Sequence, residues 1–208
     1  REPDTCRRPT RGSWAGSLAD MPILRRRRGS SARSARTLPL EMREQLRQPA
    51  LGAVPLDEDG SAWAVATTDA LVVFSGRSEP EHYVWDEVEQ GSWDAGERAF
   101  TLRWTDLDRN DLVLSVPAGT RDGNTYASTD VAPFAKALRQ RVEAAIVHSA
   151  VTTLPSGAAA TASVRRGADG NLYSVTRPTM SQVSDEEDAE ALQALENRVR
   201  EGVGLHTR

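Results

Sequence analysis

The 208-residue sequence has one cysteine, one lysine and 5% aromatic residues. A single cysteine, Cys6, cannot form a disulfide within the chain, which excludes a small domain held together by disulfides and fits a reducing compartment. No apolar run approaches the roughly 18 residues of a membrane-spanning helix. The clearest apolar run, residues 70–74, has the length of a strand. The composition therefore favours a globular, cytoplasmic protein with a modest core.

The sequence also has few residues that carry catalysis. The three histidines, His82, His148 and His206, are far apart and lack the spacing of metal ligands. His148 adjoins Ser149, but neighbouring residues of a strand point to opposite faces. No phosphate-binding or nucleophile motif is present. We therefore expect no metal, no cofactor and no enzymatic activity.

Two further segments resemble ligand-binding sites, but each is explained more simply as an ordinary structural element. Residues 119–124 contain two glycines and an arginine, which suits either an anion cradle or an ordinary mobile loop, and we expect the loop. The acidic residues 185–190 lack the spacing and the central glycine of a calcium loop, and they are typical of a helix start. Four tryptophans are expected in the core, although one exposed ring could mark a partner groove: Trp63, Trp85, Trp93 and Trp104.

Charge is distributed unevenly along the chain. Residues 1–48 contain 12 arginines against five acidic residues, whereas residues 49–208 contain 14 basic residues against 25 acidic ones. Six arginines fall within residues 25–36 and are the candidate anion contacts: Arg25, Arg26, Arg27, Arg28, Arg33 and Arg36. They can contact nucleic acid, anionic lipid or the acidic remainder of the chain, or they can be a solvated tail. With one lysine among 26 basic residues, the composition resembles that of high-GC actinobacterial proteins, which favours the solvated tail.

The pattern divides the chain into three parts. Residues 1–37 are predicted to be a disordered basic tail, in which residues 1–20 are either not native, with Met21 as the natural start, or the edge of a fragment. The tail is not an export signal, because no apolar segment of about 7–15 residues follows the arginines. Residues 38–147 are predicted to form one domain and residues 148–208 a small appendix.

Leu38, Met42 and Leu46 recur every four positions at the start of the domain, which predicts a short helix over residues 39–48. From residue 51 the apolar period changes to two, which is the period of a strand. Strands are expected at 51–56, 61–68, 70–74, 82–88 and 111–116, with a hairpin over 91–105 that turns at residues 94–97. Six or seven short strands in meander order are typical of an antiparallel sheet or barrel.

A loop over residues 117–128 is expected to lead to an amphipathic helix capped by Ser128 or Thr129. Its apolar stripe is Val131, Phe134, Leu138, Val142 and Ala145. The appendix is predicted to contain a strand over 145–154, a hairpin over 160–176 and a helix over 184–205 that begins with a capping box from Ser184 to Glu187. The fold class is therefore α+β, with a β-hairpin and helix unit after the main sheet.

Three segments of the main domain resemble the pleckstrin-homology-like (PH-like) fold, in particular the PH-like domains of bacterial proteins. They are WAVATTDALVVFSG, YVWDEVEQGSWDAGERAFTLRW and DVAPFAKALRQRVEAAI. In such domains a strand ending in Thr-Asp, an apolar strand and a W/Y-x-x-V/I segment recur, as at Thr68-Asp69, 70–74 and Trp85 to Val88. The resemblance covers about residues 50–147.

The resemblance implies a binding scaffold for lipid headgroups, peptides or proteins. The family's phosphoinositide-binding members use a basic loop between the first two strands, but the matching turn here, residues 57–60, is acidic. We therefore expect a non-catalytic binding or regulatory protein with a protein partner. The alternatives are a nucleic-acid-binding protein that uses the arginine arm and a protein that attaches peripherally to a membrane.

Overall fold

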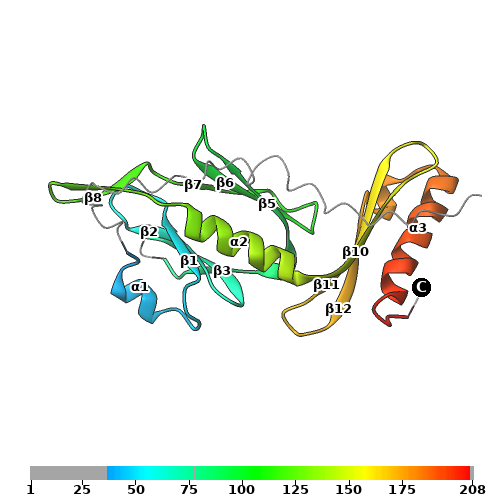
Figure 1. The fold of residues 1–208 in the computed structure, drawn as a ribbon, viewed down its shortest axis with the longest axis horizontal. Helices are drawn as coiled ribbons and strands as arrows, with labels where there is room; N and C mark the ends of the chain where they lie inside the picture. Colours follow the sequence, from blue (N-terminus) through cyan, green and yellow to red (C-terminus); the bar gives the residue numbers. More distant parts are fainter. Residues whose placement is uncertain (1–36, 77, 207–208) are drawn as a thin grey trace, which may run out of the picture. The chain divides into compact units, whose positions relative to one another are not determined.

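The computed structural model describes residues 37–206 except Arg77, so the six candidate arginines lie outside the described residues. The described chain divides into two compact units, residues 37–145 and 146–206. The fold is mixed α+β: three helices accompany strands that form four separate antiparallel sheets rather than one closed barrel (Figure 1). Within the described residues, no helix is long and apolar enough to span a membrane.

The first unit contains nine strands. They are β1 (Gly52–Pro55), β2 (Ala62–Ala66), β3 (Ala70–Ser75), β4 (Glu81–Val84), β5 (Val88–Asp94), β6 (Ala99–Trp104), β7 (Leu112–Ser115), β8 (Gly119–Asp122) and β9 (Thr125–Ser128). Strands β1 to β4 form one sheet in chain order, β5 to β7 form a second, and β8 and β9 form a hairpin. The predicted meander is confirmed, and a one-turn 3-10 helix, η1 (Trp85–Glu87), replaces the end of the strand predicted over 82–88.

Helix α2 (Ala132–Ala145) packs against both larger sheets of this unit through β1 and β5 (Figure 1). All five residues of the predicted apolar stripe are buried. The predicted cap is wrong by one or two residues, because Asp130 Oδ1, rather than a hydroxyl of Ser128 or Thr129, accepts the backbone N–H of Ala132 at 3.0 Å. The negative charge of this carboxylate also interacts favourably with the positive, N-terminal end of the helix dipole.

Aromatic rings join α2 to the second sheet. Phe134 of α2 meets Phe100 of β6 edge to face, with ring centroids 5.0 Å apart. Phe100 in turn lies 4.4 Å from the ring of Trp93 on β5. Phe134 and Phe100 are fully buried, and such pairs contribute about 0.5–1.5 kcal/mol beyond the burial of their area. The helix is therefore part of the core of this unit.

Helix α1 (Leu40–Glu44) covers the other face of the first sheet, where Trp63, Val65, Val72 and Phe74 form a second buried cluster with Leu38. Its five residues are half the predicted length. The helix ends early because the chain tightens there into a turn, in which the Gln45 N–H donates to the Met42 carbonyl oxygen at 3.3 Å. Met42 and Leu46 still pack against the cluster as their spacing predicted.

The predicted loop over residues 117–128 is wrong, because it forms the β8–β9 hairpin. Gly123 has φ +56° in its turn, a conformation that glycine adopts without strain. Across the hairpin, a Cβ on Gly119 would lie 2.5 Å from the Ala127 carbonyl oxygen, a backbone atom that no rotamer change can move, so only glycine fits at this position. The segment is therefore a two-stranded sheet rather than the predicted loop.

The second unit contains β10 (Ile146–Thr153), β11 (Ala159–Arg166) and β12 (Leu172–Arg177), paired in chain order, then η2 (Met180–Gln182) and α3 (Glu186–Glu201). Helix α3 lies on one face of this sheet, and Leu192, Leu195 and Val199 are buried in the cluster that it forms with β11, with Val203 partly buried beside them. The N-cap is Asp185 rather than Ser184, since Asp185 Oδ1 accepts the Asp188 N–H at 3.1 Å.

Candidate functional site

The histidines do not assemble a site. His82 and His148 are exposed on β4 and β10, and His206 is exposed near the end of the described chain. Within residues 37–206, no group of three or more histidine, cysteine, aspartate or glutamate residues is placed to hold a metal ion. The four tryptophans of this range are all buried, so the predicted core role is confirmed and none of these rings is an exposed groove marker.

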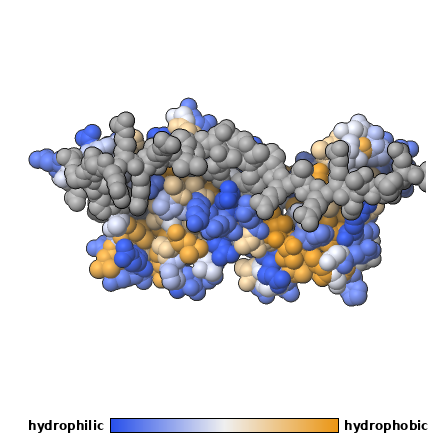
Figure 2. Space-filling view, in the orientation of Figure 1, coloured by the Kyte–Doolittle hydropathy of each residue, from blue (hydrophilic) through white to orange (hydrophobic). Residues whose placement is uncertain are grey.

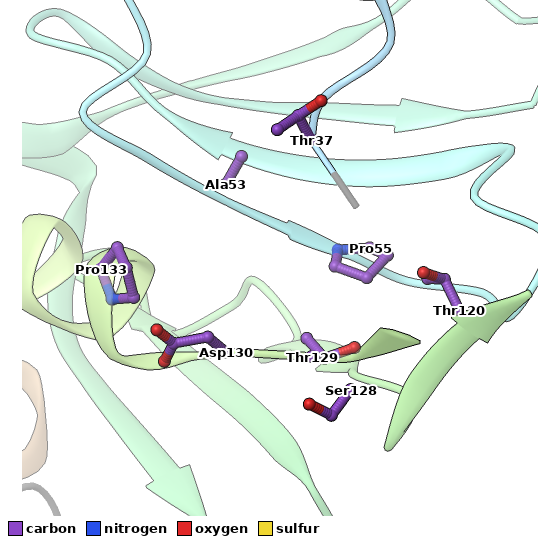
Figure 3. Close-up of a pocket in the computed structure, with 8 residues that line it drawn as sticks. All are labelled: Thr37, Ala53, Pro55, Thr120, Ser128, Thr129, Asp130 and Pro133. Atoms are coloured by element: carbon purple, nitrogen blue, oxygen red, sulfur yellow. The ribbon is translucent and has the colours of Figure 1, made fainter. Parts of the chain in front are cut away.

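One small cavity lies where β1, the β8–β9 hairpin and the start of α2 meet (Figure 3). Its volume is about 180 Å³, and its lining is mostly hydroxyls and small apolar side chains: Thr37, Ala53, Pro55, Thr120, Ser128, Thr129, Asp130 and Pro133. Thr129 Oγ1 is buried there without a hydrogen-bond partner. The one carboxylate, Asp130, already caps α2. Since pockets for organic ligands are usually about 300–1,000 Å³, this cavity suits water-sized groups and we do not place the function there.

A second constellation is richer in chemistry. The arginine cluster consists of Tyr83 on β4, Glu87 on η1, Trp104 at the end of β6 and Arg109 in the following loop. The Arg109 guanidinium carbon lies 3.6 Å from the centroid of the Trp104 ring and 5.2 Å from that of Tyr83. Arg109 Nη1 is also 3.0 Å from Glu87 Oε2. Two aromatic faces and a carboxylate thus surround one cation, as in sites that recognise cations.

The local fold holds the walls of this cluster in place. Trp104 is 3% exposed, and its Nε1–H donates to the Asn110 carbonyl oxygen at 2.8 Å, which closes the loop behind Arg109. The Tyr83 ring lies 5.2 Å from that of Trp104, and its hydroxyl donates to Glu81. By contrast, the side chains of Arg109 and Glu87 are 35% and 47% exposed. The two rings of Trp104 and Tyr83, which form an aromatic cage, are therefore fixed by the sheet, whereas the Arg109 side chain inside the cage faces solvent.

The surroundings of the cluster are acidic. Residues 79–111 contain ten aspartates and glutamates against three arginines. Of these arginines, Arg103 is paired with Asp111 at 3.6 Å, and Arg98 donates to the carbonyl oxygens of Val116 and Pro117, both at 3.1 Å. A cation that approaches this surface is attracted by the carboxylates before it meets the aromatic rings.

The sequence did not reveal the arginine cluster, because its members come from four different elements. Tyr83 and Arg109 are 26 positions apart and are brought together only when β4 and the end of β6 come side by side. One signal was present: Arg109 is the single basic residue of the acidic segment 105–111.

The pKa of the Tyr83 hydroxyl is raised from 10.0 to about 12 by burial, by its hydrogen bond to Glu81 and by the charge of that carboxylate, and Arg109 opposes the shift. At pH 11 Tyr83 should be about nine-tenths protonated, whereas an unshifted tyrosine would be about one-tenth protonated. The difference in absorbance at 295 nm between the native chain and Tyr83→Phe measures this fraction. Because the folded pKa is raised, the stability that Tyr83 contributes below pH 10 should be lost as the pH rises through about 12. A Tyr83 midpoint near pH 10 would contradict this geometry.

No protein-family model and no curated protein matches the chain. Among solved structures, it is similar to the complex of the FERM and C-terminal domains of Drosophila Merlin, with 16% sequence identity and a TM-score of 0.33. The match covers 50% of this chain and 32% of that one, so it spans about a third of the other protein. A similarity at this level supports no inference about fold, activity or partner.

Proposed function

We propose that this chain is a non-catalytic binding protein built on a PH-like domain, and that its partner is a protein that presents arginine or lysine side chains to the arginine cluster. A cytoplasmic location is part of this proposal. The observation that carries it is the guanidinium held between Trp104, Tyr83 and Glu87 on an acidic surface.

The order and packing of the elements support the PH-like assignment. Seven antiparallel strands form sheets of four and three in meander order, and the next long helix, α2, packs on both sheets. This is the arrangement expected from the resemblance of residues 50–147. The β8–β9 hairpin between the last of these strands and α2 is an addition to that pattern.

The partner's cation is expected to exchange with Arg109. An exposed cation–π contact stabilises by only about 0.5–1 kcal/mol, and a half-exposed ion pair contributes about 0.2–1 kcal/mol. Arg109 can therefore leave the cage by rotating its side chain, while the rings of Trp104 and Tyr83 stay in place. An arginine or lysine of the partner would then make the same contacts in the same site.

The test is a titration of the full chain with a labelled peptide whose arginines are separated by glycine and serine. The matching citrulline peptide has nearly the same shape without the charge. Arg109→Ala should increase the affinity for the arginine peptide by about two- to fivefold, because the internal competitor is removed. Glu87→Gln should weaken binding by a similar factor.

The control for charge is Arg103→Ala, which removes one positive charge from the same acidic segment, residues 79–111, and is not one of the four residues of the cluster. It should increase the affinity less than Arg109→Ala does. Equal effects of the two variants would mean that only the net charge of the chain acts and would reject the cation site. If the citrulline peptide bound as tightly as the arginine peptide, the cation site would also be rejected.

The same titration separates the alternatives that rest on Arg25 to Arg36. Tighter binding of single-stranded nucleic acid or anionic vesicles than of the peptide, lost on deletion of residues 21–37, would replace the proposal with the corresponding alternative. Turnover of an ester, phosphate or peptide substrate that a single polar substitution abolishes would reject the non-catalytic assignment.

A further inference from the structure

The first strand of the second unit, β10, is an edge strand of its three-stranded sheet. It pairs only with β11 in the described residues, and α3 lies on one face of the sheet that they share. Its sequence, IVHSAVTT, contains no aspartate, glutamate, lysine, arginine or proline. Edge strands are usually protected from pairing with other chains by charges, proline, short length or a β-bulge. Strand β10 has eight residues with no charge and no proline, and its one irregularity lies at its start, between Ile146 and His148.

The other edge strands of the described residues differ from β10. Strands β7 and β9 are uncharged but only four residues long. The rest contain a proline or charged side chains: Pro55 in β1, Glu81 in β4, Glu89 and Asp94 in β5, Arg121 and Asp122 in β8, and Arg177 in β12. The lack of protection is therefore specific to β10.

The side chains of β10 that point away from α3 are exposed. Val151 is 58% exposed, and Ser149 and Thr153 on the same face are also exposed. Val147, at the irregularity of the ladder, is 40% exposed as well. Figure 2 shows hydrophobic surface over the region of β10 to β12. A strand that offers both an unpaired backbone edge and an uncharged face can pair with another strand of the same kind.

We propose that β10 pairs in antiparallel fashion with β10 of a second copy of this chain, so that the two three-stranded sheets become one sheet of six strands. The occupant is a second copy because an uncharged strand is complementary to itself, with no like charges facing each other across the twofold axis. A regular ladder runs from His148 to Thr153, beyond the irregularity at Ile146. If the twofold axis passes between the two copies of Val151, the regular part of each strand is paired and Val151 of one copy lies opposite Val151 of the other.

Sedimentation equilibrium of the full chain over a hundredfold range of concentration tests the proposal. The native chain should dimerise, and Val151→Lys should raise the dimer dissociation constant by about tenfold or more, because two lysines would face each other. The matched control is Val113→Lys on β7, since Val113 is 57% exposed, and it should leave the dimer intact. A native chain that is monomeric throughout, or equal weakening by both variants, would overturn the proposal.

Disulfide formation tests the register in a background that lacks Cys6. Opposed residues of an antiparallel pair have Cα atoms about 4.5–5.5 Å apart, within the range of a disulfide. Val151→Cys should therefore form a covalent dimer under mild oxidation. Ser149→Cys is the control, because its own copy would lie about 13 Å away along the strands. Crosslinking that is equally fast in both variants would contradict specific pairing, whether or not the arginine cluster binds a partner.

Discussion

Replacing Phe134 with alanine is expected to lower the free energy of unfolding of the 37–145 unit by about 3–5 kcal/mol. Phe134 is fully buried and its ring meets Phe100 of the second sheet, so the substitution removes an aromatic contact between α2 and that sheet and leaves a cavity in the core. Urea unfolding followed by tryptophan fluorescence measures the change. Four of the five tryptophans, Trp63, Trp85, Trp93 and Trp104, lie in this unit, and residues 146–208 contain none. The fifth, Trp14, is outside the described residues and is the same in every variant, so the difference between variants reports on the unit.

The control is Arg139→Ala on the same helix. The Arg139 side chain is 48% exposed and pairs only weakly with Glu143, at 3.7 Å, so its loss should change the stability by less than about 0.5 kcal/mol. A loss of under about 1 kcal/mol for Phe134→Ala would show that α2 does not join the two sheets, and the PH-like assignment would fail with it.

Gly52→Ala is expected to destabilise the same unit by about 1–3 kcal/mol, although the change adds a single methyl group. A Cβ at Gly52 would lie 2.7 Å from both the Phe134 Cα and the Pro133 carbonyl oxygen. Both atoms belong to the backbone of α2, so no rotamer change can relieve the contact and the helix must shift away from β1. The midpoint of urea unfolding, followed by tryptophan fluorescence, measures the effect.

Gly91→Ala makes the same chemical change where β5 packs on the same helix. There the added Cβ would lie 3.2 Å from Leu138 Cδ2, the end of a side chain that can move. The cost should therefore be smaller, and it is partly offset by about 0.4–1 kcal/mol from the reduced freedom of the unfolded chain. If the two variants lose equal stability, the close approach of α2 to β1 is wrong.

The strands and the long helices were predictable because their apolar residues repeat with the period of the element. The stripe on α2 and the alternation of Phe100, Leu102 and Trp104 on β6 each identify one buried face, and all these residues are buried. Burial of such a face contributes several kcal/mol, which exceeds any local preference of the backbone.

Features that contribute only about 1 kcal/mol or less to the free energy of folding were harder to predict. A serine or threonine was predicted to cap α2 and α3, but the capping side chain is Asp130 in α2 and Asp185 in α3. The sequence could not distinguish them because serine, threonine and aspartate cap helices almost equally well. The β8–β9 hairpin was missed because its four-residue strands have no clear alternation. In that segment the Asp122-Gly123 turn signal was the better guide.

The arginine cluster lay beyond sequence reasoning for a different reason. Its four side chains meet only where β4 and η1 lie beside the end of β6, and no local pattern encodes these contacts. The predicted arginines Arg25 to Arg36 lie outside the described residues, so their contact with nucleic acid or lipid stays a prediction.

The most direct test of the proposed function is the nuclear magnetic resonance signal of the Trp104 indole N–H in the full chain, during titration with the arginine peptide and with its citrulline analogue. Exchange of Arg109 for the peptide's guanidinium should shift this signal with the arginine peptide only, and the shift should saturate at lower peptide concentration in Arg109→Ala. A peptide that binds while the Trp104 signal stays unchanged, or equal shifts from both peptides, would contradict the cation site.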